Sequence, residues 1–174
     1  MTDAAADLLE RALAEEATKK SGLVWVRGSG PARAVWHVWH EGAALLVGGG
    51  PGEQPLPEGL ADGGRRAEVT VRSKDKGGRI VAWSAAVRFL APHSEEWEAA
   101  VAELKGKRLN APDAESMTER WARTCTVVRL TPETVSTALP DTSLAAVPLP
   151  TGATTREPAP AAVPRLLLKR RRKG

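Results

Sequence analysis

The sequence predicts a mainly β domain with peripheral helices, in which six antiparallel strands form one barrel-like sheet, followed by a disordered C-terminal tail. Three observations lead to this prediction. The stretch from Leu23 to Gly50 holds three short runs rich in valine and tryptophan, separated by turn residues, which is typical of an antiparallel meander. Two further runs, 68–73 and 79–90, alternate apolar and polar residues around a glycine-containing turn. From residue 133 onward, prolines interrupt a segment rich in alanine, threonine and valine.

The chain begins with a predicted helix over residues 4–19, which Ser21-Gly22 ends. Acidic residues come early in this segment and two lysines come late, as the helix dipole favours. Apolar side chains recur at helical spacing, and we expect this stripe to pack over one mouth or edge of the sheet. The stripe consists of Leu8, Leu9, Ala12, Leu13 and Glu16.

Strands are expected over 23–27, 34–40 and 43–50, and the two-residue turn Glu41-Gly42 makes the last two a tight hairpin. The second hairpin pairs 68–73 with 79–90. Its alternation places Val71 opposite Val81 and Val69 opposite Trp83, with Glu68, Thr70 and Arg72 on the other face.

Two helices and a last strand complete the predicted domain. Ser94 caps a helix that runs to Lys105, because a serine side chain satisfies the free amides of a first turn. A shorter helix follows over 114–122, with Met117 one turn before Trp121. The last strand is expected over 123–130, ended by Thr131-Pro132, so that the domain spans residues 1–132.

Composition and charge limit the classes of protein to which the chain can belong. No run approaches the roughly 18 apolar residues that a membrane span needs, and no secretory signal precedes the first helix, so we expect a cytoplasmic protein without a membrane partner. The single Cys125 excludes an internal disulfide and multi-cysteine zinc patterns; we expect it to be a small buried residue on the last strand.

The net charge of +4 is unevenly distributed along the chain. The last ten residues carry six positive charges and no acid, so residues 1–164 have a net charge of −2. We therefore expect a Pro/Ala-rich flexible linker over 133–164 and a basic tail over 165–174. The tail could bind the phosphate backbone of nucleic acid or only keep the protein in solution. Its basic residues are Arg165, Lys169, Arg170, Arg171, Arg172 and Lys173.

The order and lengths of the elements resemble the FMN-binding split barrel of the pyridoxamine 5′-phosphate oxidase-like proteins and of related deazaflavin-dependent reductases. The stretches that carry the resemblance are Leu23–Gly50, with its Val35–His40 and Leu45–Gly50 strands, and Arg66–Leu90 followed by the Ser94–Lys105 helix. The resemblance covers residues 4–132. It lies in element order and not in a catalytic signature, and the oxidase substrate signature near the C-terminus is absent, so a role in vitamin metabolism is not expected.

The resemblance implies a homodimer with a flavin in the groove between two chains, and an oxidoreductase whose substrate the sequence does not identify. FMN, a deazaflavin or no cofactor remain open. The competing hypothesis is a non-enzymatic dimeric scaffold whose basic tail binds nucleic acid. The tryptophans of the strands also favour a dimer, because their aromatic area is large for one small barrel.

Three groups of residues are candidates for holding a flavin. Arg72, Ser73, Lys74 and Lys76 are the densest set of phosphate-binding side chains in residues 1–132, although their sequence also suits an ordinary solvated turn. Gly49 and Gly50 could turn backbone amides toward a phosphate or a ring edge, or could form a plain irregular end of a strand. His37 could line the cofactor groove.

No metal site is expected. His37 and His40 are three residues apart on one strand, so their side chains point to opposite faces and cannot share an ion. For the same reason Trp36 and Trp39 should lie on opposite faces. No catalytic residue can be assigned from the sequence.

Overall fold

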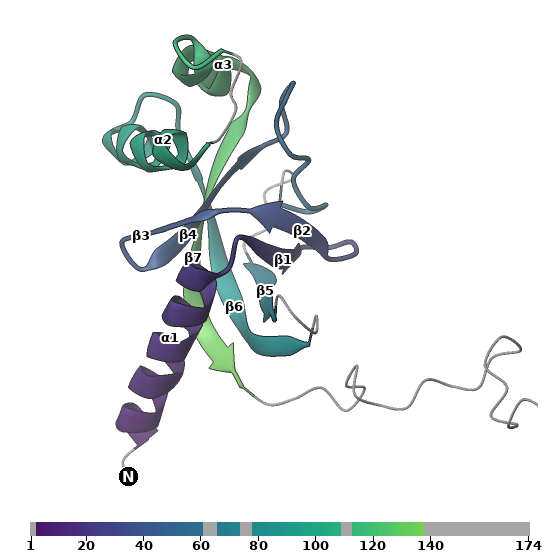
Figure 1. The fold of residues 1–174 in the computed structure, drawn as a ribbon, viewed down its shortest axis with the longest axis vertical. Helices are drawn as coiled ribbons and strands as arrows, with labels where there is room; N and C mark the ends of the chain where they lie inside the picture. The colour runs from purple at the N-terminus through teal and green to yellow at the C-terminus, as the bar shows by residue number, and fades with distance from the viewer. Residues whose placement is uncertain (1–2, 61–65, 74–77, 109–112, 138–174) are drawn as a thin grey trace, which may run out of the picture. The chain divides into compact units, whose positions relative to one another are not determined.

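A curled antiparallel sheet forms the centre of the fold in the computed structural model, which describes residues 3–60, 66–73, 78–108 and 113–137 (Figure 1). Its strand order is β2-β1-β5-β6-β7-β4-β3. The strands are β1 Leu23–Arg27, β2 Arg33–Trp36, β3 Val38–His40, β4 Ala43–Gly48, β5 Arg66–Arg72, β6 Arg79–Leu90 and β7 Thr126–Ser136. The helices are α1 Asp3–Lys20, α2 Glu95–Lys107 and α3 Met117–Thr124. The predicted mainly β fold with peripheral helices is therefore confirmed.

The seventh strand arises because the predicted strand 34–40 divides at His37. Its first half, β2, pairs with β1 and places Val35 opposite Val24. Its second half, β3, pairs with β4 and places Val38 opposite Leu45. Because β2 and β3 are consecutive in the chain but form the two edges of the sheet, the sheet curls round into a split barrel.

The side chain of Gln54 occupies the position of a neighbouring strand at this division. Its Oε1 accepts a hydrogen bond from the Trp36 amide at 2.8 Å, and its Nε2 donates to the Trp36 carbonyl at 2.9 Å and to the Val47 carbonyl at 3.1 Å. One amide side chain thus satisfies the backbone groups that the split leaves without a strand partner. The turn Glu41-Gly42, with φ values of 45° and 72°, joins β3 to β4 as predicted.

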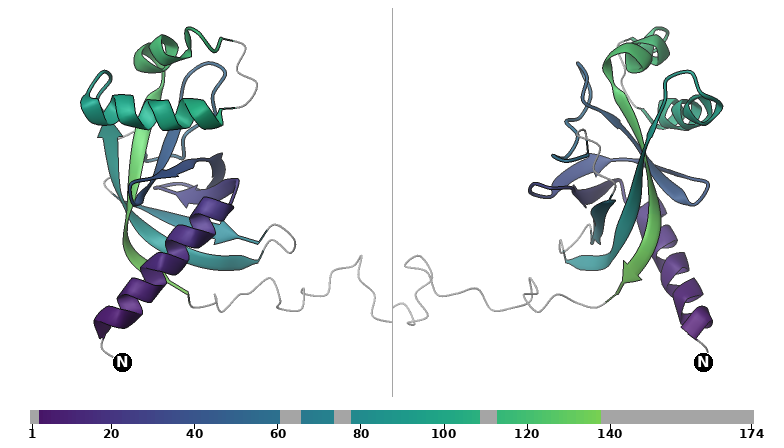
Figure 2. Two further views of the ribbon diagram at one scale, coloured as in Figure 1. Left: turned by 60° about the vertical axis from the view of Figure 1, so that its left-hand side comes forward. Right: turned by 180° about the vertical axis from the view of Figure 1, so that it is seen from behind.

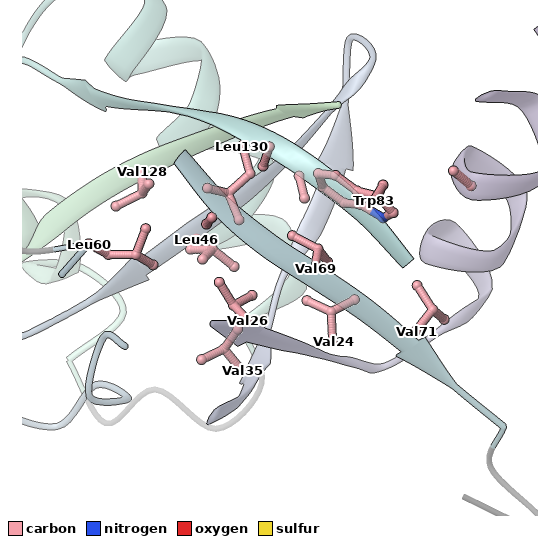
Figure 3. Packing of buried hydrophobic residues seen from close by; sticks show 14 of the residues in the cluster. Val24, Val26, Val35, Leu46, Leu60, Val69, Val71, Trp83, Val128 and Leu130 are labelled. Atoms are coloured by element: carbon pink, nitrogen blue, oxygen red, sulfur yellow. The ribbon is translucent and has the colours of Figure 1, made fainter. Parts of the chain in front are cut away.

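The interior of the barrel is filled by alternate residues of the strands, which point toward one another (Figure 3). The predicted register of the second hairpin is confirmed: Val71 lies opposite Val81 and Val69 opposite Trp83. The rings of Trp39 and Trp83 pack edge to face, with their centroids 6.1 Å apart. Fully buried members of this core include Val24, Val26, Val35, Leu46, Leu60, Val69, Trp83, Val128 and Leu130.

A second apolar cluster lies on the outer side of β4 and β7, where α2 and α3 cover the sheet. Trp97 of α2 and Trp121 of α3 are fully buried there, and Trp36 packs against this cluster whereas Trp39 packs against the first. The two neighbouring tryptophans therefore face opposite sides, as expected. The predicted cap of α2 is confirmed, because the Trp97 amide donates to Ser94 Oγ at 3.2 Å.

Packing within the chain therefore buries most of the tryptophan surface. Of the tryptophans in the strands, Trp83 is fully buried, Trp36 and Trp39 pack against the two clusters, and Trp25 is half-buried. Aromatic area alone does not require a second chain to cover it. The expected dimer consequently needs a different surface as its physical basis.

Helix α1 covers the mouth of the barrel, but not with the predicted apolar stripe. Ala14 and Thr18 are its buried residues, and the Thr18 hydroxyl donates to the Ala14 carbonyl and accepts from Trp83 Nε1 at 3.3 Å. Leu8, Leu9 and Leu13 are instead exposed. The N-terminal end of the helix extends past the strands (Figures 1 and 2).

The last strand begins and ends later than predicted. The Cys125 amide donates to the Trp121 carbonyl at 3.1 Å and ends α3, so Cys125 is a half-buried residue before β7 and not a strand residue. β7 then continues to Ser136, four residues past the boundary expected at residue 132. The long β6 supplies the pairing partner, down to Ala82 opposite Ser136, and a register shift opposite Ser84 and Ala85 accommodates Pro132.

The predicted linker beyond residue 137 and the basic tail lie outside the described residues. No helix in the described part of the chain is long and apolar enough to cross a membrane.

Candidate cofactor site

The outer face of β1, β5 and β6 carries Arg72, one of the residues that the sequence predicts to bind a phosphate. Because Val24, Val69 and Val81 point into the core, the residues that alternate with them point outward. One row across the sheet pairs Trp25 with Thr70, Thr70 with Ala82, and Ala82 with Ser136. Apart from Trp25, these side chains are small. Thr70 is half-buried, Ala82 is buried and Ser136 is exposed, so only part of the row is open beside the aromatic ring.

Arg72 lies at the end of β5, next to this row. Its guanidinium carbon stands 4.3 Å from the centroid of the Trp25 ring. Stacking uses the face of the guanidinium, whereas its N–H donors lie in the plane of the group and point sideways. Among the described residues, no carboxylate forms an ion pair with Arg72. The side chain is exposed, so the stacked arginine presents a positively charged donor group at the end of the sheet.

Ser73 follows directly and closes the hairpin, because its amide donates to the Gly78 carbonyl at 2.8 Å. Arg72 and Ser73 also line a cavity of about 420 Å³ between α1 and the end of the β5–β6 hairpin, together with Leu13, Ala17, Val71 and Ile80. Lys74 and Lys76 lie outside the described residues. The structure thus brings two of the predicted phosphate-binding residues together at the rim of an open cavity.

Gly49 and Gly50 serve the packing of their own chain. The Gly49 amide donates to the Gln54 carbonyl at 3.0 Å, and its φ of 84° suits glycine. A Cβ on Gly50 would lie 2.5 Å from Cys125 Sγ, so only glycine allows this approach. The end of β4 lies alongside Leu90 across β7, whereas Arg72 pairs with Arg79. These two ends of β6 are about 36 Å apart along the strand, so the structure does not bring the glycines and Arg72 together.

His37 lies at the split of the barrel and faces α1. Its Nε2 donates to the Thr18 carbonyl at 3.0 Å, because the carbonyl can only accept. Its Nδ1 is buried and has no hydrogen-bond partner among the described residues. Burial lowers the pKa of His37, an effect that the Thr18 carbonyl partly offsets. His37 shares the core-facing side of its strand with Val35 and Trp39, and so does not line the outer face.

A buried ionic network, which sequence reasoning missed, holds the loop after β4 against α2 and α3. The side chain of Glu53 is fully buried, and its Oε1 accepts from Arg120 Nη2 and Trp121 Nε1, both at 3.0 Å. Its Oε2 lies 3.2 Å from Nε of Arg108. Arg120 also pairs with Asp113 and lowers the pKa of that carboxyl. Arg108 and Arg120 lie 55 and 67 residues after Glu53 in the sequence, so no local pattern predicts the network.

This network is balanced in charge and its groups contact one another, so its role is to hold the glycine-rich loop in place.

A second cavity, of about 320 Å³, lies at the far end of the outer face between Arg27 and Arg66. Both guanidiniums there pair with acids, Arg27 with Glu68 and Arg66 with Glu133. Arg72 is therefore a better candidate for binding an anion than Arg27 or Arg66. Among the described residues, no group of three or more His, Cys, Asp or Glu could hold a metal ion.

Comparison with solved structures identifies the same fold in other proteins. The heme storage protein HutZ from Vibrio cholerae matches with a TM-score of 0.53 at 9% identity, over 71% of this chain and 91% of that chain. A candidate pyridoxamine 5′-phosphate oxidase from Listeria innocua matches with a TM-score of 0.50 at 11% identity, over 74% and 96% of the two chains.

No protein-family model matches the sequence, and neither does any curated protein. The two structural matches nevertheless confirm, at the level of the fold, the resemblance to the pyridoxamine 5′-phosphate oxidase-like split barrels.

Proposed function

We propose that the protein binds a flavin-type cofactor and acts as an oxidoreductase, with FMN as the first choice and a deazaflavin as the alternative. The observation that carries the proposal is the pair Arg72 and Trp25: an exposed guanidinium stacked on an aromatic ring, beside Ser73, on the open face of a split barrel. The fold is shared with a candidate pyridoxamine 5′-phosphate oxidase, which supports the cofactor class.

The described residues fit such a cofactor in part. Arg72 and Ser73 would hold the phosphate, with Lys74 and Lys76 as predicted further contributors, because a guanidinium and a hydroxyl are suitable donors to a phosphate dianion. The half-buried Thr70 beside the half-buried ring of Trp25 suits the edge of a flat ring system. Gly49, Gly50 and His37 are engaged elsewhere in the fold and are not included in this site.

A bound flavin would supply hydride or electron transfer. The chain's own contribution is to bind and orient it: Arg72 neutralises the phosphate, and the covered interior behind the sheet keeps the outer face rigid. We further propose that the protein forms a homodimer, as the resemblance implies.

The test compares FMN with riboflavin, which lacks only the phosphate. We expect Arg72→Ala to weaken FMN binding about 10- to 150-fold, the equivalent of losing a hydrogen bond to a charged group at about 1.5–3 kcal/mol. Riboflavin binding should remain nearly unchanged. Fluorescence titration measures both affinities.

Arg88→Ala is the matched control, because Arg88 is an exposed arginine on β6 about 30 Å along the strand from Arg79. FMN affinity should be the same in this variant as in the unaltered protein. If the unaltered protein binds neither FMN nor a deazaflavin, the proposed function is rejected. If Arg72→Ala weakens both ligands equally, the phosphate lies elsewhere.

A second proposed function rests on the charge distribution of the sequence. Residues 165–174 carry six positive charges and no acid, whereas residues 1–164 carry a net −2. Any binding of nucleic acid should therefore depend on the basic tail, with little sequence preference, because such a segment contacts phosphates and not base edges.

A further inference from the structure

Two hydrogen bonds from separate segments of the barrel converge on one residue of α1, the buried Thr18. His37, at the division between β2 and β3, donates through Nε2 to the Thr18 carbonyl at 3.0 Å. Trp83 of β6, whose ring nitrogen points toward the helix, donates to the Thr18 hydroxyl at 3.3 Å (Figure 3). We call Thr18 and these two donors the α1 latch.

Apolar burial contributes little to the docking of α1. Among the described residues of the helix, only Ala14 and Thr18 are fully buried, and Ala17 is half-buried. Such small side chains gain much less from burial than a leucine does. The leucines of the helix are instead exposed, namely Leu8, Leu9 and Leu13. An element with so few buried apolar contacts opens at a lower free-energy cost than the core strands do.

The position of α1 also determines the shape of the larger cavity. Of the cavity of about 420 Å³, one wall belongs to the helix and the residues just after it, and the opposite wall to the end of the β5–β6 hairpin. Detachment of α1 would remove the first wall while the sheet stays intact. The helix side of the cavity consists of Leu13, Glu16, Ala17, Lys20 and Ser21.

His37 makes the docking of α1 sensitive to protons. The neutral ring uses Nε2 for the Thr18 carbonyl, and its Nδ1 is buried with no hydrogen-bond partner among the described residues. Protonation places a second N–H donor on Nδ1. A buried donor without an acceptor is costly, and a buried positive charge more so. Once α1 has detached, water can solvate the charged ring. The docked helix therefore favours neutral His37, and the detached helix accepts the proton.

Charged neighbours do not offset this cost. Burial lowers the pKa of His37, and the effect that opposes it is the hydrogen bond to the Thr18 carbonyl. The charged groups beside Thr18 on α1 and beside His37 along its strand have partners of their own: Glu15 with Lys19, Glu16 with Lys20, Arg33 with Glu58, and His40 with Glu41 and Glu103. The core-facing residues of β6 are uncharged.

We propose that α1 is a detachable wall of the cavity, held to the barrel by the α1 latch and released when His37 is protonated. The population of the detached helix increases as the pH falls below about 6.5, the ordinary pKa of histidine. At a pH of about 5.5 the detached histidine is protonated about 10:1, so the detached population increases up to about tenfold relative to pH 7.5. The release of α1 does not depend on which ligand the cavity binds.

Native-state hydrogen exchange of the full chain tests whether α1 detaches by itself. A detached helix of 18 residues is marginal in water, so its amides exchange. We expect the amides of residues 14–20 to exchange through an opening that depends weakly on urea, because little surface becomes exposed. The amides of β6 should exchange through global unfolding, with the full urea dependence. One shared urea dependence for α1 and β6 overturns the proposal.

The same measurement at two pH values tests the role of His37. After correction for the intrinsic exchange rate, the opening constant of α1 should be up to about tenfold larger at pH 5.5 than at pH 7.5. His37→Gln keeps an N–H donor for the Thr18 carbonyl but cannot titrate, so its constant should be equal at both. His93→Gln, at an exposed histidine, is the control and should keep the pH dependence. A change of less than about twofold in the unaltered protein, or the full change in His37→Gln, overturns the proposal.

Thr18→Val tests the latch separately from the proton. Valine keeps the shape of threonine but lacks the hydroxyl that accepts from Trp83, so α1 should open about 2- to 10-fold more often at both pH values. The matched control is Thr124→Val, because the hydroxyl of Thr124 also donates to the carbonyl four residues earlier but is exposed on α3. If Thr18→Val opens α1 no more than Thr124→Val does, the latch does not hold the helix and the proposal is wrong.

Discussion

Replacing Glu53 with glutamine should destabilise the fold more than any other change of one polar atom in the described chain. The carboxylate is fully buried between Arg108 and Arg120 and accepts a hydrogen bond from the indole of Trp121. Glutamine has nearly the same shape and can still accept that hydrogen bond through its Oε1. The substitution therefore removes one negative charge and leaves two guanidiniums without their shared partner.

The size of the effect follows from the burial of each group. Breaking a buried ion pair by removing one partner costs about 3–5 kcal/mol, since the remaining charge stays desolvated. Here the side chains of Arg108 and Arg120 are 26% and 21% exposed, and Arg120 keeps Asp113. Both facts favour the low end, about 3 kcal/mol. For a domain of this size, that corresponds to a decrease in Tm of about 10 °C.

Chemical denaturation and thermal unfolding followed by circular dichroism measure the loss. The matched control is Glu58→Gln, because Glu58 lies in the same loop but is 63% exposed and stands 3.8 Å from Arg33. An exposed pair of this kind contributes less than about 1 kcal/mol. If Glu53→Gln and Glu58→Gln unfold within about 1 kcal/mol of each other, the network does not hold the loop and the reasoning is wrong.

Two further predictions concern pH and the basic tail. Because burial lowers the pKa of His37 in the folded state, the unfolded chain takes up a proton first as pH falls below about 6.5. Stability should therefore decrease by up to about 1.4 kcal/mol per pH unit until the pH reaches the folded pKa. Subtracting the urea-unfolding profile of His37→Gln isolates this contribution, and an equal effect of the exposed His93→Gln would contradict it. For the tail, truncation after Thr137, just past the end of β7, should abolish binding to duplex DNA. The affinity of the intact chain should fall with salt at a logarithmic slope no steeper than about −5, and DNA binding retained by the truncated chain would assign the contact to the barrel.

The local sequence pattern was enough to predict the features that depend on residues close together in the chain. The pairing of Val71 with Val81 followed from strict alternation on both sides of a short turn, since a slip of one residue would expose every valine. Ser94 caps α2 through an amide only three residues away. The Arg72-Ser73 pair stays a prediction of the same local kind, because its members are adjacent and their chemistry is visible in the sequence.

Tertiary structure decided the features that depend on residues far apart in the chain. The strand 34–40 divides because its two halves pair with different strands, and Gln54 completes the division from 18 residues away. β7 continues to Ser136 because β6 is long enough to pair with it, although Pro132 interrupts the local sequence there. Gly50 is needed because Cys125, 75 residues further along the chain, lies against it.

The amphipathic helix α1 shows the physical reason most clearly. Its sequence determines that one side is apolar, but not what that side meets. The barrel mouth takes Ala14 and Thr18, because Trp83 offers an N–H to the threonine hydroxyl, and the leucines remain on the surface. Periodicity along a chain records which residues share a face, whereas the partner of that face is set by contacts between distant segments, to which local periodicity contributes nothing.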